Sequence, residues 1–140
     1  MLFRSEILGC GGTIAKHVQS GDIVSSIIFG EGITSRDKVN TNQNSLDQLH
    51  TAAKLANKII GVKNLFFEKL EDNSLDKFNR LKIVKIIEKY ILDFEPDAIY
   101  THHVGDVNID HQILHHSTIT AARPLPGSCV KKLQIGRAHV

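Results

Sequence analysis

Histidines and carboxylates gather between positions 100 and 111, in the stretch Tyr-Thr-His-His-Val-Gly-Asp-Val-Asn-Ile-Asp-His. Neutral imidazole is a common ligand of zinc and other borderline metals, and carboxylates often orient such histidines. The pattern therefore indicates a candidate metal centre, although the same residue types are also typical of a polar loop and a helix surface. The chain has eight histidines, and five of them fall close together, at His102, His103, His111, His115 and His116.

The local spacing alone does not complete a metal site. A catalytic zinc ion takes about three protein ligands and keeps one position open, and nothing here matches HExxH, CxxC or an EF-hand loop. His115 and His116 follow His111 by four and five residues. We therefore expect them to be helix-surface or packing residues and not ligands.

Length and composition limit the class of protein. The 140 residues allow one domain, and the chain is 41% hydrophobic and 23% charged, which suffices for one core. A net charge of +2 gives no electrostatic case for a nucleic acid or an anionic membrane partner. No apolar run approaches the roughly 18 residues of a membrane span. The two cysteines, Cys10 and Cys129, form no disulfide framework, so we expect a cytoplasmic protein.

Strand and helix patterns alternate along the chain. This alternation predicts βαβ units and a parallel sheet, in which ligands bind beyond the carboxyl ends of the strands. Two loops leave strand ends, residues 30–36 and 102–108, and the second carries histidines. The regular pattern ends at Pro124, Pro126 and Gly127. Helices are expected over residues 6–20, 46–60, 74–93 and 109–122, and strands over residues 23–29, 64–70 and 97–101.

Three segments together resemble the LmbE-like, PIG-L-type deacetylases. Glu6-Ile-Leu-Gly-Cys-Gly-Gly-Thr-Ile-Ala-Lys-His resembles the stretch that follows the family's first zinc motif, Ala-His-Pro-Asp-Asp-Glu. Pro-Asp-Ala-Ile-Tyr-Thr-His-His, residues 96–103, followed by Asn108-x-Asp110-His111, is similar to the second motif. Gly30-Glu31-Gly32 and Arg36 stand where members have a short acidic-glycine loop and an arginine. The similarity covers residues 6–132.

The resemblance implies a fold, a reaction and a cofactor. The expected fold is α/β, a Rossmann-like three-layer sandwich with a mostly parallel sheet. The expected reaction is the zinc-dependent removal of an N-acetyl group from an N-acetylglucosamine-type sugar or glycoconjugate. The expected partner is then a small N-acetylated sugar or glycoconjugate. Assembly into a homo-oligomer is left undecided.

The resemblance also assigns roles to residues. His111 matches the third zinc ligand, and the neighbouring Asp110 is expected to orient it. Arg36 matches a substrate-binding arginine, with a solvated loop arginine as the alternative. Asp106 either binds a substrate hydroxyl or caps the helix that follows, and aspartate near a helix N-terminus favours the cap.

One departure from the family concerns the oxyanion. Many members carry a histidine three residues before the third ligand, where it stabilises the tetrahedral oxyanion, and this chain has Asn108 there. An asparagine amide donates a hydrogen bond but carries no proton to transfer. His102 or His103 is the candidate for the missing imidazole, unless this subgroup works without one.

The larger departure lies at the start of the chain. Aligned on Glu6, the first motif falls on residues 1–5, where Leu2 and Ser5 replace zinc ligands and Arg4 replaces the general base. Residues 1–5 and 134–140 both fit translations of one sequencing-library adapter, in opposite orientations. We therefore expect residues 6–133 to be a partial deacetylase domain that lacks its first strand. We also expect the chain as written to bind zinc weakly and to be inactive.

Two other classes of function remain as alternatives. The spacing Gly9-x-Gly11-Gly12 gives slight support to a non-catalytic Rossmann-like module that binds a nucleotide or sugar, but no Gly-x-Gly-x-x-Gly follows a strand. A structural or interaction domain with incidental histidines is the other alternative. Bound zinc in a full-length form separates the hydrolase from both.

Overall fold

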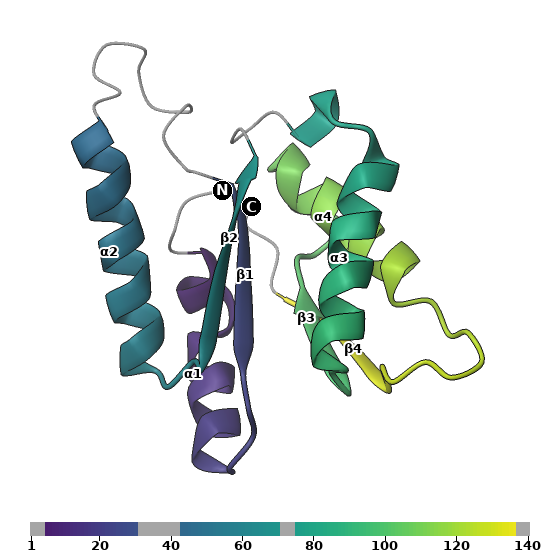
Figure 1. Ribbon diagram of the computed structural model, residues 1–140, viewed down its shortest axis with the longest axis horizontal. Coiled ribbons are helices and arrows are strands. Elements are labelled where there is room, and N and C mark those ends of the chain that lie inside the picture. The colour runs from purple at the N-terminus through teal and green to yellow at the C-terminus, as the bar shows by residue number, and fades with distance from the viewer. Residues whose placement is uncertain (1–4, 31–42, 71–74, 137–140) are drawn as a thin grey trace. The chain divides into compact units, whose positions relative to one another are not determined.

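The computed structural model describes residues 5–30, 43–70 and 75–136. The chain divides into two compact units, residues 1–73 and residues 74–140. None of the described helices is long and apolar enough to cross a membrane. In chain order the elements are α1 (Ser5–Gln19), β1 (Ser25–Gly30), α2 (Gln43–Ile59), β2 (Asn64–Leu70), the 3₁₀ helix η1 (Leu75–Lys77), α3 (Arg80–Phe94), β3 (Ala98–Thr101), α4 (Ile109–Ala121) and β4 (Lys132–Ile135) (Figure 1).

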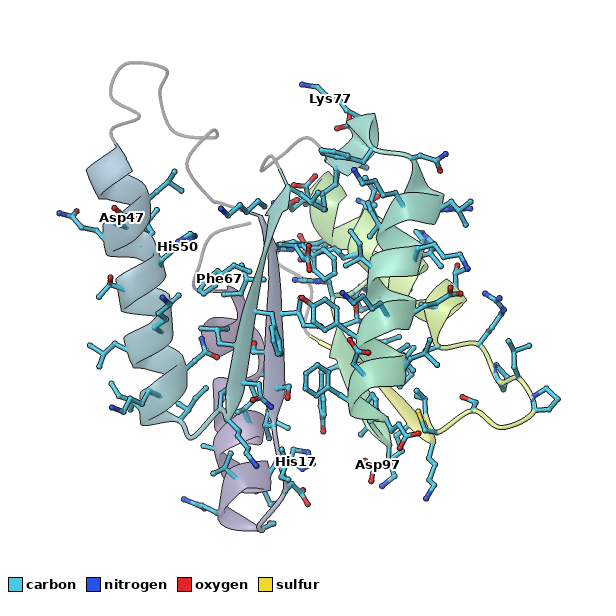
Figure 2. All side chains as sticks on the ribbon, viewed as in Figure 1. His17, Asp47, His50, Phe67, Lys77 and Asp97 are labelled. Atoms are coloured by element: carbon cyan, nitrogen blue, oxygen red, sulfur yellow. The ribbon has the colours of Figure 1, made fainter. Side chains whose placement is uncertain are left out.

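The first unit is built on the parallel pair β1 and β2, which α2 connects in the chain. The β-branched and aromatic residues of β1 and the aromatic residues of β2 favour extended backbone, and the register sets Ile28 opposite Phe67. Figure 2 shows His50 of α2 beside Phe67, with ring centroids 4.5 Å apart. Helix α2 therefore covers one face of the pair. The core of this contact consists of Ile28 and Ala53, with Leu49, Leu65 and Phe67 packed against them.

Two glycines with left-handed backbone end the helices of the first unit. Gly21 follows α1 with φ +89°, and Gly61 follows α2 with φ +85°. A Cβ atom on Gly61 would lie 2.5 Å from Cγ1 of Val18, whereas nothing lies within 4 Å of such an atom on Gly21. Gly61 thus serves both a turn and a close approach of α2 to α1.

The second unit contains the parallel pair β3 and β4, with α4 between them in the chain. Helix α4 contacts α3, η1 and β3 (Figure 1). This helix therefore joins α3, η1 and β3, and the loop after β3 leads directly into it. The buried apolar side chains of the unit are Leu75, Ile83, Val84, Ile87 and Leu114.

The predicted α/β class with parallel strands is confirmed, and most element ends agree within three residues. One predicted element is divided. The helix expected over residues 74–93 is interrupted after η1, because Asn79 adopts extended backbone and its side chain accepts a hydrogen bond from the Leu81 N–H. Asn79 therefore caps a new helix, α3.

Strand β4 was not predicted. The regular pattern of the sequence ends at Gly127, yet residues 132–135 pair in register with residues 98–101. Gln134 and Ile135, assigned to a non-native end, lie opposite Tyr100 and Thr101. Four residues are too few to show the alternation of apolar and polar side chains that predicts a strand. Only the pairing with β3 identifies β4.

The two glycines provide a matched stability test. We expect Gly21→Ala to lower the free energy of unfolding by about 1 kcal/mol, the cost of left-handed backbone alone. Gly61→Ala should lower it at least twice as much, since the added Cβ also collides with Val18. Urea denaturation measures both values. Equal losses would contradict the close approach of Gly61 to Val18, and Val18→Ala should recover part of the Gly61→Ala loss.

A surface ion pair on α3 gives a pH test. Lys85 Nζ donates to Oε2 of Glu88 at 2.7 Å, and Arg123 Nη1 lies 3.5 Å from Oε1. The hydrogen bond from Lys85 holds the pKa of Glu88 below its ordinary value of 4.5. The stabilisation is therefore present above pH 4.5 and is lost as the pH falls through the folded-state pKa. We expect Glu88→Gln to cost under about 1 kcal/mol at neutral pH. The difference in the free energy of unfolding between Glu88→Gln and the unmodified chain should disappear when unfolding is measured at increasingly acid pH.

Candidate functional site

The loop between β3 and α4 folds around Asp106. The Asp106 N–H donates to the His103 carbonyl at 3.2 Å, which turns the chain back. Oδ1 of Asp106 accepts a hydrogen bond from the Asn108 N–H at 2.9 Å, and the Gln112 side chain donates to the Asp106 carbonyl at 2.6 Å. Aspartate favours this geometry because its short side chain can satisfy backbone groups two residues ahead. The Asp106 residue is 1% exposed as a result.

Asn108 begins α4. Its Oδ1 accepts hydrogen bonds from the N–H groups of Asp110, at 2.9 Å, and His111, at 3.4 Å. These are among the N–H groups that the start of a helix leaves without a helical partner. The cap fixes the first turn of α4 and hence the position of His111.

Asp106 and His111 form a buried pair. Oδ2 of Asp106 lies 2.8 Å from Nδ1 of His111, and their side chains are 1% and 5% exposed. A carboxylate only accepts hydrogen bonds, so Nδ1 carries the proton and donates it. Nε2, also buried, is then the nitrogen with the lone pair. A metal-ligating histidine oriented by a carboxylate has this arrangement.

The carboxylate at Nδ1 of His111 is that of Asp106 and not that of Asp110, which the sequence predicts for this role. Oδ1 of Asp110 accepts a hydrogen bond from the Leu75 N–H at 3.2 Å, which ties α4 to η1. The burial of Asp106 favours this orienting role over contact with a substrate hydroxyl. The spacing Asp-x-Asn before a helix, typical of consecutive side-chain turns and caps, is the signal that points to it.

The two histidines that follow β3 lie in different surroundings. The ring of His102 stacks on that of His111, with centroids 4.1 Å apart and planes 20° apart. His103 is exposed, and its Nδ1 accepts a hydrogen bond from the Gly105 N–H at 2.9 Å. Of the two candidate imidazoles, His102 is therefore the one that contacts His111.

His115 and His116 differ in burial. His115 is 4% exposed and lies inside the unit, whereas His116 is exposed. Their rings meet edge to face with centroids 5.3 Å apart. The expectation of packing and surface residues thus fits the surroundings of both.

Several predicted site residues lie outside the described residues. They are Arg36 with Glu31 and Gly32, and Leu2 and Arg4 at the start of the chain. Gly30 is the last residue of β1, and Ser5 is the first residue of α1. The predicted role of Arg36 in substrate binding therefore stays a prediction.

The described part of the chain offers one histidine that could hold a metal ion. His111 fits one ligand, because Asp106 orients its ring and Nε2 retains the lone pair. Within residues 5–30, 43–70 and 75–136, no group of three His, Cys, Asp or Glu side chains is arranged to hold a metal ion. These residues alone do not make the three-ligand site that a catalytic zinc needs.

Comparison with known proteins identifies a family and a fold. The family model described as "PIG-L: GlcNAc-PI de-N-acetylase" matches residues 6–122. No curated protein matches the chain significantly. The N,N'-diacetylchitobiose deacetylase from Pyrococcus horikoshii is similar in structure, with a TM-score of 0.76 and 19% identity, over 89% of this chain and 48% of that chain.

Two further solved structures share the fold, each at 19% identity. A conserved protein from Thermus thermophilus has a TM-score of 0.71, over 96% of this chain and 61% of that one. GalB, the 4-carboxy-2-hydroxymuconate hydratase from Pseudomonas putida, has a TM-score of 0.70, over 91% of this chain and 57% of that one. The chain thus spans about half to three-fifths of the length of these structures.

The buried pair leads to a test of the His111 tautomer. We expect Asp106→Asn to move the ring proton of neutral His111 from Nδ1 to Nε2. If the amide oxygen of the substituted side chain still accepts the hydrogen bond from the Asn108 N–H, the amide NH₂ group faces Nδ1 of His111. Nδ1 must then accept a hydrogen bond and cannot carry the proton. Two-bond ¹⁵N–¹H correlation spectra distinguish the tautomers. Asp110→Asn is the matched control, since its amide oxygen still accepts from Leu75. A retained Nδ1–H in folded Asp106→Asn would contradict the assignment.

Proposed function

Because the chain belongs to the PIG-L family of GlcNAc-PI de-N-acetylases, we propose that it is part of a zinc-dependent hydrolase. The proposed substrate is an N-acetylglucosamine-type sugar or glycoconjugate, which loses its N-acetyl group. The single observation that supports this most is the buried pair of Asp106 and His111 at the carboxyl end of β3. A cytoplasmic location and a homo-oligomer remain predictions.

His111 is the proposed zinc ligand in this part of the protein. Zinc, when bound, supplies a Lewis acid that polarises the amide carbonyl and activates water. Asp106 keeps the proton on Nδ1 of His111 and so leaves the lone pair on Nε2. Asp110 acts on the site by tying the first turn of α4 to η1.

The remaining residues of the loop have proposed roles at the substrate. His102, whose ring stacks on that of His111, is proposed to donate a hydrogen bond to the developing oxyanion. His103 is the weaker candidate, because its Nδ1 accepts from its own loop. Asn108 uses its side-chain oxygen to cap α4, which leaves its NH₂ group as the part of the side chain that could donate to substrate. Arg36 is proposed to contact the sugar.

We further propose that the 140-residue chain itself binds zinc weakly and does not deacetylate. Leu2 has no ligand atom, and Arg4 is a cation that cannot act as a general base at neutral pH. Ser5 replaces a carboxylate with a neutral hydroxyl. One histidine ligand does not hold a catalytic zinc ion by itself.

The fold alone does not select this reaction, since one similar structure is a hydratase and another a deacetylase. The family match favours the deacetylase. A non-catalytic module that binds a sugar or nucleotide remains the competing function, and it requires neither zinc nor the buried pair.

The function is tested by comparing two chains. One is the 140-residue chain, and the other carries, before Glu6, the first strand and the Ala-His-Pro-Asp-Asp-Glu stretch of a full-length family member. Metal analysis and acetate release from N-acetylglucosamine-type substrates are measured for both. We expect about one zinc ion per extended chain, with zinc-dependent acetate release, and neither property in the shorter chain.

Substitutions in the extended chain make the test specific. His111→Ala should abolish zinc binding and activity, and the exposed His116→Ala serves as the matched control with both retained. An extended, folded chain without zinc would refute the hydrolase and favour the binding module. Zinc-dependent acetate release by the 140-residue chain would refute its proposed inactivity.

A further inference from the structure

His115 is a buried histidine with no part in the proposed reaction. It follows His111 by one turn of α4 and is 4% exposed. A buried imidazole has lost its water and needs a protein partner. Nδ1 of His115 lies 2.7 Å from the carbonyl oxygen of His102. Because that oxygen only accepts, Nδ1 of His115 carries the proton and donates it.

The same helix also holds the residue before His102. Oγ1 of Thr101, at the end of β3, donates to Oγ1 of Thr118 at 3.3 Å. Thr118 in turn donates to the Leu114 carbonyl at 2.7 Å, so its hydroxyl is fixed. The consecutive residues Thr101 and His102 are therefore hydrogen-bonded to α4, at Thr118 and His115 respectively.

These two bonds determine where the ring of His102 can lie. His111 and His115 are four residues apart in one helix and share a face of it. When His115 holds the main chain of His102, the His102 side chain starts beside that face, and its ring stacks on His111. The next residue, His103, has no such bond to α4 in the described structure and is exposed.

We propose that His115 is a positioning residue of the site, which places the His102 ring against His111 by holding the His102 carbonyl. The meaning of this contact for catalysis rests on the proposed function, but the contact itself requires no zinc. Packing alone would be served equally well by leucine. The donor at Nδ1 is what the imidazole adds, and asparagine carries an NH₂ donor at the corresponding branch position.

The test uses NMR on the 140-residue chain. In the unmodified chain we expect the Nδ1–H tautomer at His115 and a nuclear Overhauser contact between the rings of His102 and His111. His115→Leu should lose this contact. It also removes the hydrogen bond that holds the start of the loop, so the Asp106 N–H, which donates to the His103 carbonyl within that loop, should exchange about tenfold faster. His115→Asn should retain the contact. His116→Leu, at the exposed neighbour, is the control and should leave it unchanged.

Two results would overturn the proposal. One is an Nε2–H tautomer at His115 in the unmodified chain, and the other is a ring contact that persists in folded His115→Leu. If His115→Leu does not fold, the tautomer and the His115→Asn spectrum decide. Because none of these readouts depends on zinc or acetate release, a failure here is distinct from a failure of the proposed function.

Discussion

The second unit depends on keeping the carboxylate of Asp106 buried. A buried charge without partners costs on the order of several kcal/mol, so its oxygens must receive hydrogen bonds. The donors come from the Asn108 N–H and from Nδ1 of His111, on either side of the start of α4. The loop and the first turn of the helix therefore stabilise each other. The same contacts that make the loop stable also set the tautomer of His111.

Helix α4 extends this principle along its length through a buried face that is largely polar. Asp110 binds the backbone of η1, His115 binds the loop after β3, and Thr118 binds the end of β3. The hydrophobic effect has no direction of its own, whereas each hydrogen bond requires a narrow range of distance and angle. We infer that these bonds set the register of α4 against its neighbours. A histidine on this helix is thereby placed more narrowly than apolar packing alone would place it.

The sequence predicted those features that arise from local patterns. Periodic apolar residues predicted the long helices, a β-branched run predicted β1, and the alternation of helix and strand patterns predicted the parallel pairing. The histidine loop was placed correctly after β3. Strand β4 was missed because its four residues are defined by pairing with β3, which is 34 residues away in the register. The break before α3 was missed because the apolar spacing continues through Asn79, whose cap is a matter of backbone conformation.

The orienting carboxylate of His111 shows why adjacency in sequence is a weak guide to contact. Asp110 is the neighbour of His111, but consecutive side chains on a helix point about 100° apart and do not face each other. Asp106 is five residues away, and the turn at Asn108 folds it back over the first turn of α4. All the hydrogen bonds of this arrangement lie within the second unit. The protein alone therefore orients the histidine, and its ring would need no ordering on binding the proposed metal ion.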